Sequence, residues 1–260
     1  MKTLSKNFLF SLKLNQYLII LHILGIYSLL NLVNTLPHHW LIPFVIGYFI
    51  IMILGVSIGY HRLISHGSFK TNIFWKIVLL FLGMLSFQGS PLFWGALHRN
   101  YHHKYADTDK DPHSPIHGFS HSYIGWLWKI KKTDVSFRCV PDLLRDSIVI
   151  FFHKHYTFLL LTTCLFIGAI NINWLLYGII LPALITFHAW CMITSFSHCS
   201  KFSYRNYKTK DNSLNIVWLW PLAFGEAWHN NHHGKQRNFS TSHKWFELDP
   251  AKYIIQWIKK

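Results

Sequence analysis

Residues 40–66, WLIPFVIGYFIIMILGVSIGYHRLISH, join a long apolar run to a pair of histidines. The run, residues 40–58, contains no charged side chain, and His61 and His66 follow it directly. A bilayer core of roughly 30 Å needs about 20 apolar residues in a helix, so this run is long enough to cross a membrane. The segment therefore predicts a transmembrane helix that brings candidate metal ligands to one membrane surface.

The composition of the whole chain agrees with a membrane protein. Of its residues, 51% are hydrophobic and only 13% are charged, which is too apolar for an ordinary soluble domain. The net charge of +15 points to anionic lipid or an anionic substrate, because the chain contains no nucleic-acid-binding motif. Its four cysteines lack CxxC spacing, so neither a disulfide framework nor a thiolate metal site is expected.

Three more apolar runs, residues 17–33, 157–172 and 174–194, are also long enough to be candidate spans. The turns at residues 34–39 and 171–173 contain no lysine or arginine, whereas the other connecting segments contain all 25. By the positive-inside rule, the two turns are external and both termini are cytoplasmic. This topology predicts two helical hairpins.

A fifth apolar run, residues 74–94, contains Lys76, Gln88 and Pro91. It cannot cross if the basic segments on either side of it are both cytoplasmic, so we expect an interfacial or re-entrant helix. The predicted fold is thus an all-α integral membrane domain covering residues 1–260. It has four transmembrane helices and a cytoplasmic helical cap formed by residues 59–155 and 197–260.

Histidines are concentrated in the predicted cytoplasmic segments, as HRLISH at residues 61–66, HRNYHH at 98–103, TSFSH ending at 198 and HNNHH at 229–233. Residues three or four apart share one face of a helix, and imidazole suits iron, copper and zinc. Nine candidate ligands follow: His61, His66, His98, His102, His103, His198, His229, His232 and His233.

Nine imidazoles exceed the needs of one octahedral ion, which indicates two metal ions. A shell poor in carboxylates and lacking thiolates disfavours magnesium, calcium and iron–sulfur clusters. Zinc fits the ligand type, but structural zinc normally takes four ligands. Two irons with positions open for O2 fit the pattern better. The other ten histidines show no cluster pattern and are not assigned as ligands.

Four acidic residues lie near the histidine clusters: Asp107, Asp109 and Asp111 after the second, and Glu226 just before the last. Metal-bound histidines commonly donate their second N–H group to a carboxylate. We therefore predict that these side chains orient the ligands. Roles as solvated loop acids or helix caps are the alternative.

Three segments carry a family resemblance: GYHRLISHGSFK from Gly59, FQGSPLFWGALHRNYHHKYADTDKDPHSP from Phe87, and DNSLNIVWLWPLAFGEAWHNNHH from Asp211. They resemble the membrane fatty acyl desaturases, in particular the bacterial branch of the stearoyl-CoA desaturase-like group. Spans and motifs together cover most of residues 17–250. The resemblance implies that the nine histidines are the metal ligands.

The chain departs from the family pattern in three places. The second motif reads HxxxHH where the family has HxxHH, so which of His98 and His102 binds which iron stays open. Thr194 replaces an asparagine that holds a metal-linked water in the family. Ala227 stands where the family motif GEGW has its second glycine.

The resemblance implies an enzyme that uses two Fe2+ ions and O2 to introduce a cis double bond into a saturated acyl chain, of the delta-9 acyl-CoA type. It also implies a bacterial inner-membrane location. No haem- or flavin-binding module is evident, so an external ferredoxin or b-type cytochrome with its reductase is expected. A membrane di-iron hydroxylase and a non-catalytic metal-binding receptor are the alternatives.

Five polar residues are candidates for substrate contacts. The resemblance implies an apolar tunnel that holds the acyl chain. Gln88 is expected to line a bend in this tunnel, or else it is an ordinary interfacial side chain. The other four are basic and are expected to bind the phosphates of an acyl-CoA, or to form a solvated or lipid-facing patch. They are Lys129, Lys131, Lys132 and Arg138.

Overall fold

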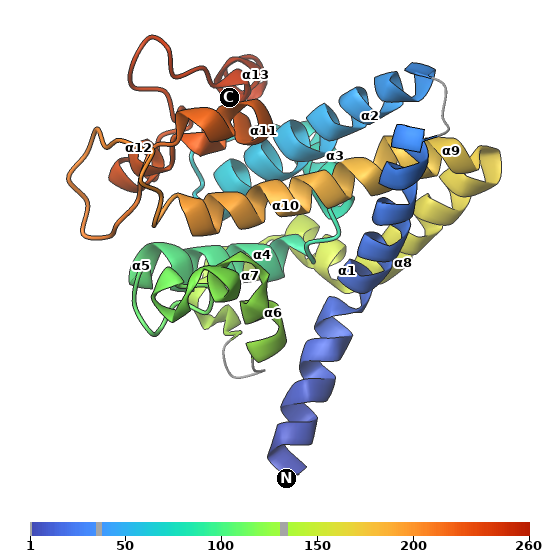
Figure 1. Ribbon diagram of the computed structural model, residues 1–260, viewed down its shortest axis with the longest axis horizontal. Helices are drawn as coiled ribbons and strands as arrows, with labels where there is room; N and C mark the ends of the chain where they lie inside the picture. Colours follow the sequence, from blue (N-terminus) through green and yellow to red (C-terminus); the bar gives the residue numbers. More distant parts are fainter. Residues whose placement is uncertain (1, 35–37, 131–134) are drawn as a thin grey trace.

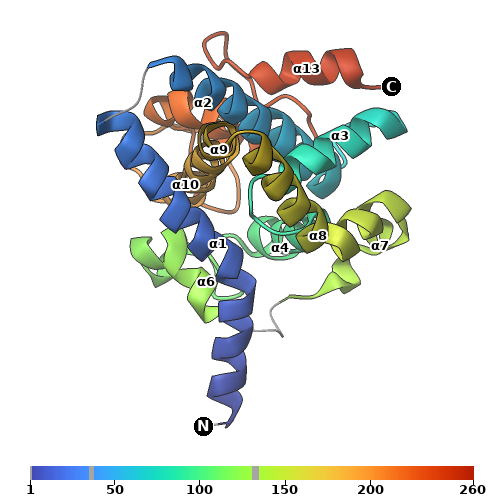
Figure 2. The same cartoon turned by 90° about the vertical axis from the view of Figure 1, so that its right-hand side faces the viewer.

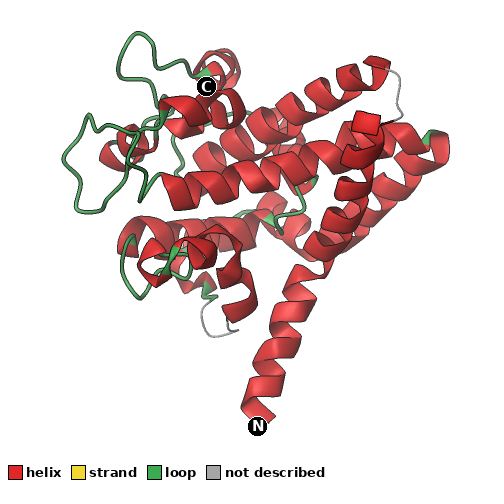
Figure 3. Ribbon diagram, in the orientation of Figure 1, coloured by secondary structure: helices red, strands yellow, loops and turns green. Residues whose placement is uncertain are grey.

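The computed structural model of the protein describes residues 2–34, 38–130 and 135–260. Within these residues the chain forms helices, turns and loops, with only isolated β-bridges and no β-strand (Figure 3). Four helical segments are long and apolar enough to cross a membrane, namely Asn15–Asn34, His38–Ser65, Ser147–Ile170 and Ile172–Phe196. The prediction of an all-α fold with four candidate spans is confirmed.

The candidate spans follow one another as two consecutive pairs along the chain (Figure 1). The first pair is α1 (Lys2–Asn34) and a helix made of η1 (His38–Trp40), α2 (Leu41–Tyr48) and the π-helical η2 (Phe49–Ser65). The second pair is α8 (Ser147–Ile170) and a helix made of α9 (Ile172–Leu175), η8 (Leu176–Ile180) and α10 (Leu181–Phe196). Helix α10 packs against both α1 and α2, so it joins the two pairs.

Side-chain caps explain where the second pair differs from the predicted boundaries. Helix α8 begins at residue 147 rather than 157, because Asp146 Oδ1 accepts hydrogen bonds from the backbone N–H groups of Ile148 (3.1 Å) and Val149 (3.3 Å). The turn after α8 is centred on Asn171, whose Oδ1 accepts from the N–H of Asn173 at 2.8 Å. The next helix therefore begins two residues before the predicted residue 174.

The single helix predicted over residues 74–94 is instead two helices, α3 (Ile73–Met84) and α4 (Pro91–Leu97). Phe87 and Gly89 adopt positive φ values of 61° and 91°, which no α-helix allows. Ser90 then caps α4 by accepting from the N–H of Phe93 at 3.3 Å, with Pro91 in the first helical turn. Neither helix is long enough to cross a bilayer alone.

The remaining elements are short and connect or cover the ends of η2 and α10 that carry the histidines (Figures 1 and 2). In chain order they are η3 (His98–His102), α5 (His103–Tyr105), η4 (Pro115–His117), η5 (His121–Gly125), α6 (Trp126–Lys129), η7 (Phe137–Cys139), α7 (Pro141–Arg145), η9 (Val217–Leu219), α11 (Trp220–Ala223), η10 (Phe224–Ala227), α12 (His229–Gly234) and α13 (Pro250–Ile258).

Helix α3 packs closely on η2 because glycines line their contact. A Cβ added at Gly55 would lie 2.7 Å from the carbonyl oxygen of Leu82 and from the backbone nitrogen of Gly83. Because both neighbours are backbone atoms, Gly55→Ala should lower the free energy of unfolding by about 1–3 kcal/mol. Thermal unfolding in detergent micelles measures the effect.

Gly178→Ala is the matched control, because a Cβ there meets no atom within 4 Å and also lies in a helical segment. We expect its unfolding midpoint to stay close to that of the unsubstituted protein. Equal midpoints for the two variants would mean that the packing of α3 on η2 tolerates a methyl group.

Candidate metal centre

All nine candidate histidines come together in two neighbouring groups. In each group, one nitrogen of every ring lies within 4.8 Å of the others. The five-histidine centre consists of His61, His66, His98, His103 and His232. The four-histidine centre consists of His102, His198, His229 and His233. The structure thus places His98 in one centre and His102 in the other, which is the assignment that the sequence left open.

Two π turns explain how histidines five residues apart reach the same centre. The backbone N–H of His66 bonds to the carbonyl of His61 at 3.1 Å, and that of His103 bonds to the carbonyl of His98. Such i to i+5 bonds define a π turn, in which residues five apart lie nearer to one face than in an α-helix. The second π turn accommodates the one residue that HRNYHH has in addition to the HxxHH motif of the family. His102 is consequently directed to the other centre.

The ring nitrogens converge closely within the five-histidine centre. The Nε2 atom of His98 lies 2.8 Å from Nε2 of His66 and 2.9 Å from Nε2 of His103. The Nε2 atom of His232, from α12, lies 3.0 Å from that of His61 and 2.9 Å from that of His103. Three separate helical segments therefore supply ligand atoms to one point.

The four-histidine centre has the same character. The Nε2 atom of His229 lies 3.2 Å from the Nε2 atoms of both His102 and His198, and Nε2 of His233 lies 3.2 Å from that of His102. His198 follows the end of α10, while His229 and His233 share α12.

Three carboxylates stand behind the four-histidine centre, each facing the Nδ1 atom of one ring. Asp211 Oδ2 lies 2.7 Å from Nδ1 of His233. The nearest oxygen of Asp107 lies 3.1 Å from Nδ1 of His198, and Asp111 Oδ2 lies 3.4 Å from Nδ1 of His102. Asp107 and Asp111 thus each lie beside a candidate ligand. Asp211 was missed, since it lies far along the chain from His233 and outside every histidine motif.

Glu226 lies behind the five-histidine centre and belongs to a buried ionic network. Its Oε2 is 2.8 Å from Nδ1 of His61, while its Oε1 is 3.0 Å from Nη2 of Arg62 and accepts a hydrogen bond from Ser57. The other arm of Arg62 contacts Asp249 Oδ2 at 2.8 Å. The guanidinium therefore neutralises two carboxylates and fixes the one that faces His61.

The tautomers that these carboxylates impose are those that a metal site needs. A neutral imidazole carries one N–H, and a carboxylate at Nδ1 fixes that proton there. His102, His198 and His233 then all direct Nε2 lone pairs into the same space, about 3 Å from one another or from His229. Lone pairs this close repel one another. A cation bound between the rings would remove that repulsion, because each lone pair would then coordinate the cation. The histidine groups are therefore able to hold metal ions.

The protonation states agree with this role. Burial, reinforced by repulsion among the rings, holds the pKa values of His98, His103 and His232 well below the ordinary histidine value, so these rings are neutral. Burial alone would raise the pKa of Asp211, but its interactions with His233 and Ser213 outweigh burial and keep that pKa well below its usual range. The carboxylate is therefore ionised.

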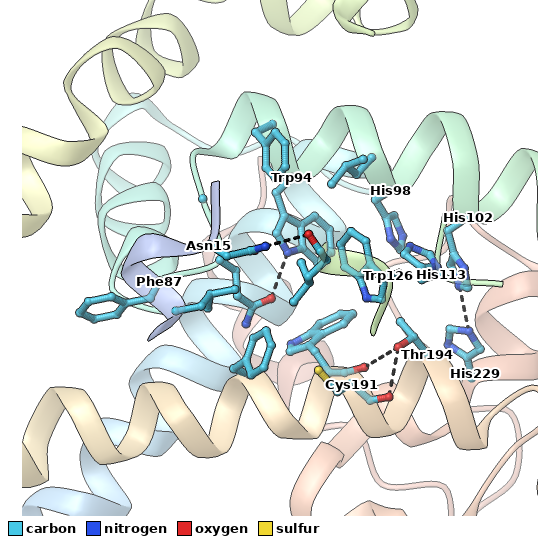
Figure 4. A pocket seen from close by; sticks show the side chains of 18 residues that line it. Asn15, Phe87, Trp94, His98, His102, His113, Trp126, Cys191, Thr194 and His229 are labelled. Atoms are coloured by element: carbon cyan, nitrogen blue, oxygen red, sulfur yellow. Dashed lines mark hydrogen bonds between the residues drawn. The ribbon is translucent and has the colours of Figure 1, made fainter. Parts of the chain in front are cut away.

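A cavity of about 120 Å³ lies between α1, α4, α6 and α10 and is lined by His102 and His229 of the four-histidine centre and by His98 of the five-histidine centre. Figure 4 shows His102 and His229 at one end, Phe87 and Asn15 toward the other, and aromatic rings between them. Most of the wall is apolar, with indole rings contributed by Trp94, Trp126 and Trp190. Such a cavity suits an unbranched apolar chain rather than a polar substrate.

Two of the predicted polar residues line this cavity. Gln88 accepts a hydrogen bond from Trp94 Nε1 at 3.2 Å, and Thr194 donates to carbonyls of its own helix, those of Trp190 (3.2 Å) and Cys191 (3.1 Å). His113, which the sequence left unassigned, also lines the cavity. Its Nδ1 lies 2.9 Å from Asp111 Oδ1.

Of the predicted basic residues, the structure describes Lys129 and Arg138. Lys129 and Arg138 are exposed, and neither lines the cavity. Lys131 and Lys132 lie outside the described residues. Lys129 does share the short helix α6 with the lining residues Trp126 and Leu127.

Asp211→Asn is expected to weaken metal binding at the four-histidine centre by about 10–100-fold, the usual cost of losing such a carboxylate. An amide at this position can donate to Nδ1 and thereby favours the wrong tautomer of His233. Titration of the metal-free protein with Co2+, followed by absorption, measures the two binding steps.

Asp109→Asn is the matched control, because Asp109 lies between Asp107 and Asp111 in sequence but is 86% exposed and faces no candidate ligand. We expect it to leave both steps unchanged. An Asp211→Asn protein that binds two Co2+ ions with normal affinity would show that this carboxylate does not support the centre.

Comparison with known proteins agrees with the geometry. Residues 34–257 match the family model described as fatty acid desaturase. The chain is 34% identical to an sn-1 stearoyl-lipid 9-desaturase of Anabaena variabilis, over 79% of this chain and 75% of that protein. It is 32% identical to Delta-9 acyl-lipid desaturase 2 of Arabidopsis thaliana, over 79% and 67% of the two chains. A third relative, the hex-5-enoyl-(acyl-carrier protein) acetylenase of Moorena producens, is 29% identical over 100% of this chain and 87% of that protein. The chain therefore belongs to the fatty acid desaturase family, the family that its sequence resembles.

Proposed function

We propose that this protein is an O2-dependent desaturase that introduces a cis double bond at the delta-9 position of a saturated fatty acyl chain. The observation that carries the proposal is the apolar cavity that ends at His102 and His229. Removal of two hydrogens from adjacent carbons, with O2, two electrons and two protons, yields the alkene and two waters. The names of the Anabaena and Arabidopsis relatives support the delta-9 position.

In this proposal each histidine centre holds one iron ion. When bound, the irons supply with O2 an oxidant strong enough to break unactivated C–H bonds, which no side chain can provide. The carboxylates behind His61, His102, His198 and His233 keep the Nδ1 protons of these four rings in place, so their Nε2 atoms remain free to coordinate. Ligand geometry is thereby set before substrate arrives.

The cavity residues hold the substrate. Indole rings exclude water and confine the chain, so that only a short stretch of carbons lies beside the histidines. Thr194 lies on the cavity wall near His229 (Figure 4). Since its hydrogen is donated to the helix backbone, its oxygen can accept a hydrogen bond from a water molecule at the centre. We assign this residue the water-holding role that an asparagine has in related sequences.

The acyl carrier we favour is a membrane glycerolipid, because two of the relatives are named as stearoyl-lipid or acyl-lipid desaturases. Coenzyme A, the carrier expected from the sequence, is the second candidate. It is favoured by Lys129, which shares a helix with two residues of the cavity wall.

The electrons come from outside the chain in this proposal, from a ferredoxin or a small b-type cytochrome with its reductase. We also propose a bacterial inner-membrane location, as the resemblance implies. The distribution of lysine and arginine supports an orientation in which both termini and the metal centres face the cytoplasm.

Expression in a host that lacks its own desaturase, followed by mass spectrometry of the total fatty acids, tests the activity. We expect a monounsaturated product that is lighter by two hydrogens. Fragmentation of the adduct that this product forms with dimethyl disulfide locates the double bond. A product heavier by one oxygen would identify a hydroxylase, and an unchanged fatty acid profile would favour a non-catalytic receptor. A pulse with labelled acetate then shows whether unsaturation appears first in glycerolipid or in acyl-CoA.

A further inference from the structure

Helices α3 and α13, which contribute no candidate ligand, lie side by side on the surface (Figure 2). The hydroxyl of Thr71, just before α3, donates to the carbonyl of Ile258 in α13 at 2.7 Å. The rings of Trp75 and Trp257 make an edge contact with centroids 5.3 Å apart. The two helices therefore present one joint surface rather than two independent ones.

Helix α13 is firmly attached through its inner face. Ala251, Ile255 and Ile258 are buried against η2 and α3, in a cluster that includes Ile53 and Leu79. Its position relative to the predicted membrane spans is therefore fixed.

The outer faces of both helices are apolar and exposed. Tyr253 is 63% exposed and Trp257 75% exposed on α13, while Phe74 is 65% exposed on α3, with Ile73 and Ile77 beside it. A water-soluble surface rarely leaves so many large apolar side chains together, so this face is expected to be covered.

Charge identifies what covers it. Residues 70–84 and 250–260 contain five lysines and no acidic residue. One of the five, Lys76, pairs with Asp146, which leaves Lys70, Lys252, Lys259 and Lys260 around the apolar face. Tryptophan and tyrosine are characteristic of the membrane–water interface. Lysines beside an amphipathic helix attract anionic lipid headgroups.

We infer that α3 and α13 together form an interfacial platform that lies in the headgroup layer and binds anionic phospholipid. Tyr253 and Trp257 insert among the headgroups, and the four lysines contact phosphate groups. The surface is continuous with a candidate membrane span, since both helices pack on η2. A lipid occupant therefore needs no additional protein partner.

Tryptophan quenching in vesicles tests the platform. The protein is reconstituted in phosphatidylcholine–phosphatidylglycerol vesicles, with phosphatidylcholine brominated on its acyl chains as one quencher and aqueous iodide as the other. Trp257→Phe should remove fluorescence that brominated lipid quenches and iodide does not. The matched variant Trp245→Phe, which replaces a 92% exposed tryptophan outside the platform, should remove iodide-sensitive fluorescence. The inference is wrong if Trp257 responds to iodide alone, or if it is shielded from both quenchers, as contact with a second copy of the chain would produce.

Lipid retention provides a second test that does not depend on fluorescence. Each lysine near an anionic surface is worth about five-fold in lipid binding. Joint replacement of Lys70, Lys259 and Lys260 by glutamine should therefore lower the phosphatidylglycerol retained in micelles by at least about five-fold, with phosphatidylcholine unchanged. Replacing the exposed Lys208 and Lys210, which lie outside the platform, is the control. Equal phosphatidylglycerol retention in both variants would overturn the inference.

Discussion

His102→Gln and His232→Gln are each expected to abolish desaturation while removing different metal ions. His102 belongs to the four-histidine centre and His232 to the five-histidine centre. A glutamine fills similar space but is a poor ligand for iron. Loss of an orienting carboxylate already costs about 10–100-fold in affinity or activity, so loss of a ligand should cost more than about 100-fold. Iron content should fall from two ions to about one per chain, with product measured by gas chromatography.

Mössbauer spectra of 57Fe-loaded protein distinguish the two variants, because each should retain a different one of the two iron signals. His117→Gln is the control: this histidine is half exposed, belongs to neither centre and should leave both signals and the product unchanged. If both variants lost the same signal, the division of the nine histidines into five and four would be incorrect.

Arg62→Met is expected to have the largest effect on stability. Its guanidinium is fully buried between Glu226 and Asp249, so methionine would leave two carboxylates without their cation in a site that water does not reach. Breaking a buried ion pair in this way costs about 3–5 kcal/mol. Thermal unfolding in micelles should show a much lower midpoint, and the five-histidine centre should lose metal because Glu226 no longer holds His61.

A second substitution checks this explanation. Adding Asp249→Asn to Arg62→Met removes one of the stranded charges and should restore part of the lost stability. Arg138→Met removes an exposed arginine and should change the midpoint little. If the double variant were less stable than Arg62→Met alone, hydrogen bonding by Asp249, rather than its charge, would be the main contribution.

Apolar length and histidine spacing were enough to predict the four candidate membrane spans and the convergence of the nine histidines. Both signals are local: a span needs an uninterrupted apolar run, and three of the four histidine motifs closely follow such a run, while HNNHH at residues 229–233 does not. The break at Phe87 and Gly89 was not predicted, because apolar residues lie on both sides of it, although the sequence Gln88-Gly89-Ser90-Pro91 favours a turn. The positive φ values of Phe87 and Gly89 show that the chain turns there.

The π turns and Asp211 could not be predicted for different reasons. Nothing in a five-residue spacing shows whether a helix will widen to place both histidines on one face, since the widening depends on ring contacts with other segments. Asp211 reaches His233 through a loop held by Ser213 and Thr209, whose donors bond to Asp211 Oδ1 at 3.0 and 2.8 Å. Such contacts depend on tertiary structure, which the pattern of residues does not contain.

Asp249, which immediately precedes α13, links the proposed interfacial platform to the five-histidine centre. This side chain contacts Arg62, which in turn fixes Glu226 and His61. If α13 rests in the headgroup layer, the two histidine centres would lie at a constant distance from that layer. On the proposed glycerolipid substrate, the position of the double bond would then be determined by its distance from the headgroup rather than from the methyl end. Acyl chains of different length would receive it at the same distance from the carboxyl carbon.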